Sequence, residues 1–225
     1  MSKFFFFTAL ALVFGFGAGG ALQADLLALW DFGPAATSYT TAATLENLNG
    51  TPLLELGGGT LDPDGKNGVA FTDAGGMARA DGQAGAWDEI NLAGGPDAYW
   101  TMTLNLYGYE RLVLRWDYKA WDASTTSFDL DYRLDPGAAW LSLLNNQAIT
   151  ADNNFHSFSI DLMPLTPIVS QPFVQFHLSD LDRNGSGKFA LDNLQVTGSP
   201  LPEPTLLLLL ACGFGICRNH KKACR

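Results

Sequence analysis

The sequence predicts an all-β protein, a jelly-roll-like β-sandwich made of two antiparallel sheets. Short runs of alternating apolar and polar residues recur along its middle, which is the period of a strand with one buried face. Clusters of Gly, Pro, Asp and Asn separate these runs, as turns require. No segment carries a sustained apolar stripe at helical spacing. The chain has 225 residues, which is enough for one domain. Because 47% of the residues are hydrophobic, the chain can bury a substantial core, and this composition excludes a disordered chain.

Nine runs are predicted to be strands. In residues 99–106, Trp100 and Met102 share one face while threonines occupy the other, and the runs 111–118 and 127–134 alternate in the same way. The other predicted strands are residues 26–32, 52–56, 69–72, 158–162, 173–178 and 189–196. Because each run is short and most have a single apolar face, two sheets must pack face to face to bury those faces.

The N-terminal residues 1–24 are typical of a secretory signal peptide. Lys3 precedes an apolar stretch from Phe4 to Phe16, and small residues lead to Ala24, as signal peptidase requires. The alternative is a buried N-terminal helix, which the four consecutive Phe and the Gly-rich exit disfavour. The sequence therefore predicts export of a domain that covers residues 25–199.

The C-terminal residues 200–225 form a second targeting segment. Its apolar run, Thr205 to Cys217, would be about 20 Å long as a helix, whereas the hydrocarbon core of a bilayer is about 30 Å thick. Basic residues follow from Arg218 to Arg225 and would stay on the cytoplasmic side. We expect a short hydrophobic sorting helix that anchors the chain in the membrane transiently, with an ordinary C-terminal anchor as the alternative.

The order of three features in this segment resembles the PEP-CTERM sorting signal of Gram-negative bacteria. These features are the motif Pro202-Glu203-Pro204, the Leu-rich run and the basic terminus. The resemblance implies export, passage through the inner membrane, recognition by an exosortase that cleaves near the motif, and association with the cell surface or the extracellular matrix and its polysaccharide. Residues 29–32 and 189–198 also resemble the recurrent body of such proteins, which is similar to concanavalin-like or carbohydrate-binding jelly rolls.

Cysteine and charge placement separate the domain from its ends. All three cysteines lie at or after Cys212, so the predicted domain has no disulfide and depends on its core, or on a metal, for stability. Residues 25–200 hold eight basic and 22 acidic residues, a net charge of −14. Such a surface excludes nucleic acid as a partner, because phosphate binding needs clustered Lys and Arg, and it attracts divalent cations.

One acidic loop is a candidate calcium site. Oxygen-bearing side chains alternate from residue 180 to 184 before Gly185, as in the first half of a calcium loop. The last predicted strand changes phase after Leu191, which a one-residue bulge at 192–193 would explain. The predicted ligands of a structural Ca²⁺ are Asp180, Asp182, Asn184, Asp192 and, if the first and last strands are neighbours, Asp31. The alternative is a plain hairpin turn.

No arrangement of residues predicts an enzyme. The domain has no Cys and no Gly-x-Ser-x-Gly, and no catalytic residue is assigned. Asp129 and Asp131 share one strand face, as the carboxylates of a glycosidase do, but that face is predicted to meet solvent, with Arg133 beside them. Aromatic residues near predicted loops form a candidate sugar-stacking surface: Trp121, Trp140, Tyr107 and Tyr109.

The sequence therefore predicts an exported, exosortase-sorted, non-catalytic protein of the cell surface or matrix, structural or adhesive in role. Two alternatives remain open. In the first alternative the domain is a carbohydrate-binding module, and in the second it is a glycoside hydrolase or lyase that acts on extracellular polysaccharide. The only cofactor expected is structural Ca²⁺, and the expected partners are the export machinery, the exosortase and extracellular polysaccharide.

Overall fold

The computed structural model describes residues 24–32, 40–42, 45–46, 48, 50–62, 66–72, 77–79, 83–90, 97–121, 127–181 and 187–201. The predicted signal peptide up to residue 23 and the sorting motif Pro202-Glu203-Pro204 lie outside these ranges. Within them, no helix is long and apolar enough to cross a membrane.

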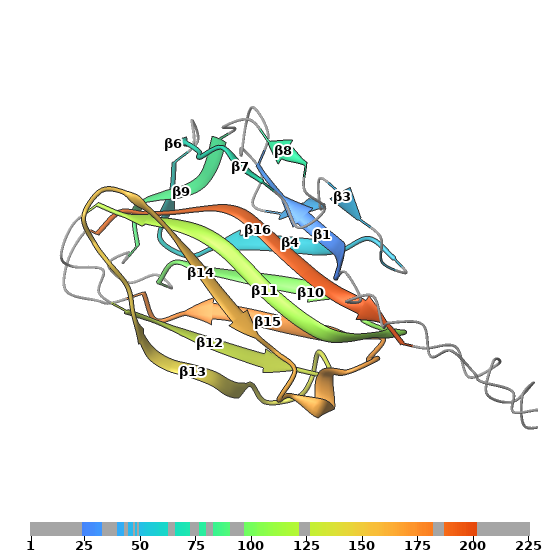
Figure 1. Ribbon diagram of the computed structural model, residues 1–225. Helices are drawn as coiled ribbons and strands as arrows, with labels where there is room; N and C mark the ends of the chain where they lie inside the picture. The colour runs from blue at the N-terminus through green and yellow to red at the C-terminus, as the bar shows by residue number, and fades with distance from the viewer. Residues whose placement is uncertain are drawn as a thin grey trace, which may run out of the picture.

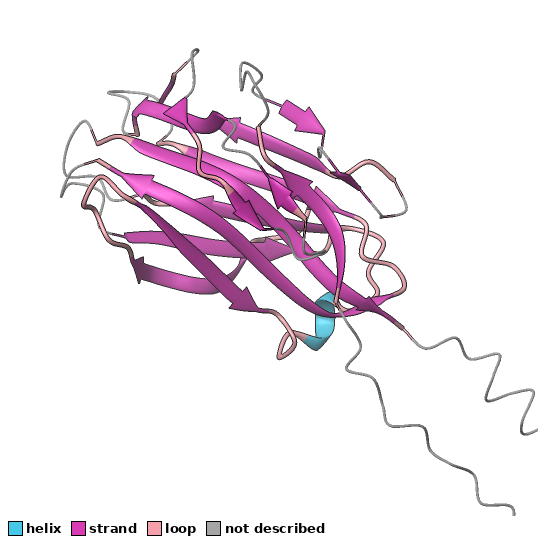
Figure 2. Ribbon diagram, turned by 45° about the horizontal axis from the view of Figure 1, so that its top comes forward, coloured by secondary structure: helices cyan, strands magenta, loops and turns pink. Residues whose placement is uncertain are grey.

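The described part of the chain is a sandwich of two antiparallel sheets (Figures 1 and 2). The first sheet has the order β14 (Phe155–Asp161), β11 (Tyr109–Ala120), β16 (Phe189–Pro200), β1 (Asp25–Trp30) and β3 (Leu45–Glu46). The strand β9 (Gln83–Glu89) also pairs with β16, and it pairs in turn with β5 (Thr60–Leu61) and β6 (Lys66–Asn67).

The second sheet has the order β13 (Leu141–Ala148), β12 (Ser127–Arg133), β15 (Val174–Ser179), β10 (Tyr99–Leu104), β4 (Leu53–Gly57) and β2 (Thr40–Ala42). A separate hairpin joins β7 (Phe71–Thr72) to β8 (Ala78–Arg79), and a single 3₁₀ turn covers Thr166–Ile168. From β9 to β16 successive strands cross between the sheets, except that β12 and β13 pair within the second sheet, so that β1-β16-β11-β14 faces β10-β15-β12-β13. This is jelly-roll connectivity, and the predicted fold class is confirmed.

The core lies between the two sheets and is rich in aromatic rings. Trp100 of β10 and Trp116 of β11 meet edge to face with centroids 5.8 Å apart, and Phe128 of β12 lies 5.6 Å from Trp116. All three side chains are fully buried, and each buried large apolar side chain contributes about 1.5–3 kcal/mol. The predicted alternation in β10 and β12 is confirmed, because their buried and half-buried residues alternate along both strands.

Two long strands escaped prediction for opposite reasons. Strand β9 is rich in Ala and Gly because it packs closely, and a Cβ on Gly85 would lie only 2.9 Å from Leu56. Strand β13 is an edge strand with irregular register against β12, and most of its residues are exposed. Neither strand therefore carries the apolar alternation that identifies a half-buried strand.

Candidate functional site

A row of rings crosses the outer face of the six-stranded sheet. Tyr99 of β10 lies 5.3 Å from His177 of β15, and Trp140, next to β13, stacks on His177 at 4.9 Å with an interplanar angle of 26°. The guanidinium of Arg133 on β12 lies 4.2 Å from the centroid of the Trp140 ring. We call these four residues, Tyr99, His177, Trp140 and Arg133, the ring platform.

Strand alternation and register assemble the ring platform. Because Trp100 and Met102 point into the core, Tyr99 and Thr101 point outward. Antiparallel pairing then sets His177 opposite both Thr101 and Asp131, so that three strands contribute to one patch of the outer face. The four platform side chains are half-buried, which leaves part of each side chain open to solvent.

Hydrogen bonds between neighbouring strands hold these side chains in place. Thr101 Oγ1 lies 2.9 Å from His177 Nδ1. Arg133 Nε donates to Gln175 Oε1 at 2.7 Å, and Gln175 Nε2 donates to Thr103 Oγ1 at 2.8 Å. The polar groups beside the rings are thus preorganised, which lowers the entropic cost of binding a ligand.

The charge on this face is set by burial and by neighbours. Burial lowers the pKa of His177 below 6.5, and the positive charge of Arg133 lowers it further, so His177 is neutral at pH 7. Burial raises the pKa of Tyr99, and Glu55 raises it through its charge and through a 3.2 Å hydrogen bond. The rings therefore stay uncharged at neutral pH, with the cation of Arg133 and the carboxylate of Glu55 beside them.

The two aspartates weighed as catalytic residues also lie on this face, as the alternation predicts. Asp129 accepts a hydrogen bond from the backbone N–H of Asn146 at 2.6 Å, which ties its carboxylate to β13. Asp131 stands opposite His177, and burial together with the charge of Asp129 raises its pKa. Asp131 therefore borders the ring platform and can accept hydrogen bonds from a ligand bound there.

The aromatic candidates of the sequence separate in the structure. Trp140 belongs to the ring platform, whereas Tyr107 is 62% exposed at a turn and Tyr109 packs against the core. Trp121 lies at the end of β11, with Lys119 Nζ 4.6 Å from its ring centroid. Sequence reasoning missed Tyr99 and His177, although an aromatic residue in the solvent phase of a strand was a usable signal.

Of the residues predicted to bind calcium, Asp192 forms part of a bulge in β16, and Asp31 is near enough for its charge to act on Asp192. Arg115 pairs with Gln195 but Asp117 pairs with Asp192, so β16 contains one extra residue here, and Asn193 has a φ of 52°. The predicted bulge is confirmed. Strand β1 is a neighbour of β16, which meets the condition for including Asp31 among the candidates, and Asp31 directly follows the Trp30–Leu194 pair. Asp180 has a φ of 52°, and the two other candidates, Asp182 and Asn184, lie outside the described residues.

The bulge holds a segment that lies over the outer face of the first sheet. Asp192 Oδ2 accepts the N–H of Val69 at 2.8 Å, and Asn193 Nδ2 donates to the carbonyl oxygen of Val69 at 3.0 Å. Asn193 Nδ2 also donates to Asp117 Oδ2 at 2.8 Å. Two side chains thus satisfy both backbone groups of Val69, a role that neither residue suggested in the sequence.

Asp192 is a strongly perturbed acid. The residue is 1% exposed, and its pKa is raised to about 7, with burial as the largest cause. The charges of Asp117 and Asp31 also raise the pKa, and the two backbone hydrogen bonds of the carboxyl group partly offset these effects. No three His, Cys, Asp or Glu side chains of the described residues are arranged to hold a metal ion. Calcium binding stays a prediction, which melting curves with and without EDTA test.

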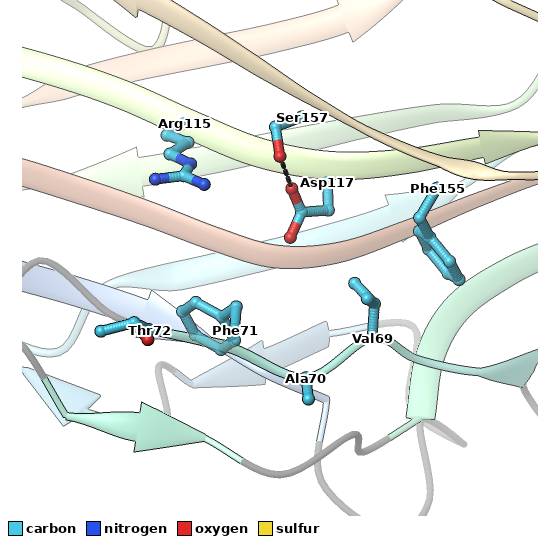
Figure 3. A pocket seen from close by; sticks show the side chains of 8 residues that line it. All are labelled: Val69, Ala70, Phe71, Thr72, Arg115, Asp117, Phe155 and Ser157. Carbon is cyan, nitrogen blue, oxygen red and sulfur yellow. Dashed lines mark hydrogen bonds between the residues drawn. The ribbon is translucent and has the colours of Figure 1, made fainter.

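A pocket lies between the same segment and the first sheet. It has a volume of about 410 Å³, and Figure 3 shows the eight side chains that line it. The four residues Val69, Ala70, Phe71 and Thr72, which we call the strap, form one wall. Strands β11 and β14 form the other wall with Arg115, Asp117, Phe155 and Ser157. The pocket is on the opposite sheet from the ring platform.

No family model and no curated protein match the sequence. Among solved structures the chain is similar to the xylan-binding domain CBM22-1 of Xyn10C from Paenibacillus barcinonensis, with 15% identity over 81% of this chain and 100% of that one and a TM-score of 0.42. It is also similar to the K3 cleaved adhesin domain of Lys-gingipain from Porphyromonas gingivalis, with 15% identity over 77% and 98% and a TM-score of 0.39. A cyclase from Fischerella sp. has 10% identity over 80% and 99% and a TM-score of 0.40. These neighbours differ in function, and with TM-scores below 0.5 none assigns one to this chain.

Proposed function

We propose that this chain is an exported, non-catalytic protein that binds polysaccharide through the outer face of its six-stranded sheet. The observation that carries the proposal is the ring platform. Tyr99, His177 and Trp140 form a continuous row of rings across that face. A large aromatic surface that is held half-exposed on a sheet, instead of in the core, is typical of a binding site.

The chemistry of the platform suits a sugar chain. A pyranose presents apolar C–H groups on its faces and hydroxyl groups around its edge, so it stacks on rings and hydrogen-bonds to polar side chains beside them. Arg133 and Gln175 supply planar donors and acceptors next to the rings, and Asp131 supplies an acceptor. Because the site is an open sheet face, it accommodates internal units of a long chain.

The terminal segments supply the remaining part of the proposal. The signal peptide at residues 1–24 and the PEP-CTERM-like segment at residues 200–225 are expected to bring the domain to the cell surface or matrix by way of an exosortase. Extracellular polysaccharide is then the ligand that the platform would meet. Binding to such a polymer gives the adhesive or structural role that the sequence predicts.

Binding of the full-length protein to a panel of immobilised polysaccharides tests the proposed activity. We expect the wild type to bind at least one glycan and Trp140→Ala to bind it about tenfold more weakly, since one stacked ring contributes about 1.5 kcal/mol. Tyr107→Ala is the matched control, because Tyr107 is an exposed aromatic residue in the turn after β10 and is not part of the platform, and it should bind as the wild type does. Uniformly blank arrays, or equal binding by Trp140→Ala, would contradict the proposal.

A further inference from the structure

The strap pocket is a second candidate site, which is concave and is built from other strands than the ring platform. Its volume of about 410 Å³ lies at the small end of ligand pockets, which span about 300–1,000 Å³. This size suits one or two sugar units, whereas the open platform suits a chain. The two sites are on different sheets, so each can be altered while the other stays intact.

The pocket combines apolar walls with a polar floor. Phe71 of the strap and Phe155 of β14 line it from two sides, and Thr72 adds a hydroxyl group. Asp117, which is 5% exposed, and Arg115, which is exposed, project into it from the same strand (Figure 3). Apolar rings around a few convergent polar groups are what small-molecule sites are made of.

Asp117 is held in position but retains capacity to accept hydrogen bonds. Ser157 Oγ donates to Asp117 Oδ1, and Asn193 Nδ2 donates to Oδ2 at 2.8 Å. A carboxylate has about four acceptor sites, so each oxygen still has room for one further donor. Both donors that fix it are neutral, and the carboxylate therefore presents its negative charge to whatever enters the pocket.

We propose that the strap pocket binds a single uncharged sugar unit, through adjacent hydroxyl groups that donate to Asp117 and accept from Arg115. The two phenylalanine rings contact the C–H face of the sugar. The charge of Asp117 near the floor repels an acidic sugar, and the exposed Arg115 compensates only weakly because solvent screens it. This site is separate from the ring platform and does not depend on the function proposed for it.

Ligand-observed NMR on the full-length protein tests the pocket, with glucose, galactose and mannose as neutral probes and glucuronic acid as the charged probe. We expect at least one neutral sugar to bind with a dissociation constant of about 1–10 mM, as the ligand efficiency of a small polar molecule allows. Glucuronic acid should bind at least fivefold more weakly. No binding by any neutral probe, or equal binding by glucuronic acid, would overturn the proposal.

Variants locate the binding. Ser157→Ala and Arg115→Gln should weaken it at least threefold, and Phe155→Ala should abolish it. Ser159→Ala is the matched control for Ser157→Ala, because Ser159 lies on the same face of β14, opposite Arg115, but does not line the pocket. If Phe155→Ala fails to fold, the milder Ser157→Ala and Arg115→Gln variants still show whether the sugar binds in the strap pocket. Loss of binding in Trp140→Ala, with the pocket variants unaffected, would place the sugar on the ring platform and refute this proposal while leaving the proposed function intact.

Discussion

At the scale of single residues, the bulge of β16 explains the most unusual side chains in the molecule. Asp192 and Asn193 act as substitutes for a neighbouring strand, because they pair with both backbone groups of Val69. An unpaired buried backbone group costs about 1–3 kcal/mol. These two hydrogen bonds remove that cost for Val69 and so stabilise the strap in its position over the sheet. The bulge also buries a carboxyl group whose pKa is raised to about 7.

Substitution of Asp192 should change how stability depends on pH. The folded protein keeps the Asp192 proton up to about pH 7, whereas the unfolded chain loses it near about pH 4. The stability contributed by protonated Asp192 is therefore full below about pH 4 and is lost as the pH rises through about 7. Asn cannot titrate, so the unfolding free energy of wild type relative to Asp192→Asn should fall by up to about 4 kcal/mol across this interval.

Urea unfolding of both proteins at several pH values measures that difference. Taking the difference cancels the titration of groups that do not interact with Asp192, including His177, whose lowered pKa acts in the opposite direction between its folded pKa and 6.5. If the unfolding free energies of wild type and Asp192→Asn differ by the same amount at about pH 4 and at about pH 7, then Asp192 is charged in the folded protein over the whole interval, which would contradict the prediction.

Removal of the Asn193 side chain should destabilise the fold. Asn193→Gly keeps the positive φ without strain but deprives Val69 O and Asp117 Oδ2 of a donor, which should cost about 1–3 kcal/mol. Asn146→Gly is the matched control. Asn146 also has a φ of 52°, but its side chain is exposed and donates to Asn145, so its loss should cost less than about 0.5 kcal/mol. Equal losses in urea unfolding would contradict the role assigned to the bulge.

At the scale of elements, strands β10, β12 and β15 carry the polar and aromatic side chains of the candidate site on their outer face and the buried core side chains on their inner face. Strict alternation in β10 and β12 makes this division visible in the sequence, and it correctly located Asp129, Asp131 and Arg133 on the outer face. Alternation does not give register, so it could not show that His177 meets Tyr99 and Trp140. Nor could it show the strap, because the bulge contacts join residues more than 120 positions apart.

The Tyr99 ring occupies its position only because Gly57 of β4 has no side chain there. The two residues are direct cross-strand partners, and a Cβ on Gly57 would overlap the Tyr99 ring. Gly57→Ala should therefore displace the ring and weaken glycan binding several-fold. Its effect on stability should be less than about 1 kcal/mol, because the displaced atoms are the mobile end of the side chain. If the effect passes through Tyr99, then Gly57→Ala should add little to the binding loss of Tyr99→Ala, and full additivity would refute this explanation.

At the scale of the whole molecule, a jelly roll without disulfides is expected to work outside the cell. Its described core is built from tryptophan, phenylalanine and leucine side chains, which substitute for the covalent links that many exported domains use. The net charge of −14 over residues 25–200 keeps such a domain soluble and away from anionic phosphate and lipid. Hydrophobic ends around an acidic sandwich are consistent with targeting segments that are removed.

The intact mass of the protein isolated from its producing cells tests this. We expect a product that begins after Ala24 and ends near Pro202-Glu203-Pro204, recovered from the cell surface or matrix. A mass equal to that of the whole 225-residue chain, or recovery in the cytoplasm alone, would contradict export and exosortase sorting.

The most direct test of the proposed function is hydroxyl-radical footprinting of the full-length protein, with and without a saturating polysaccharide. Bound polysaccharide should protect Trp140 and Tyr99 several-fold and leave the labelling of Tyr107 unchanged. Equal labelling of Trp140 in the free and the saturated protein would mean that polysaccharide does not bind on the ring platform.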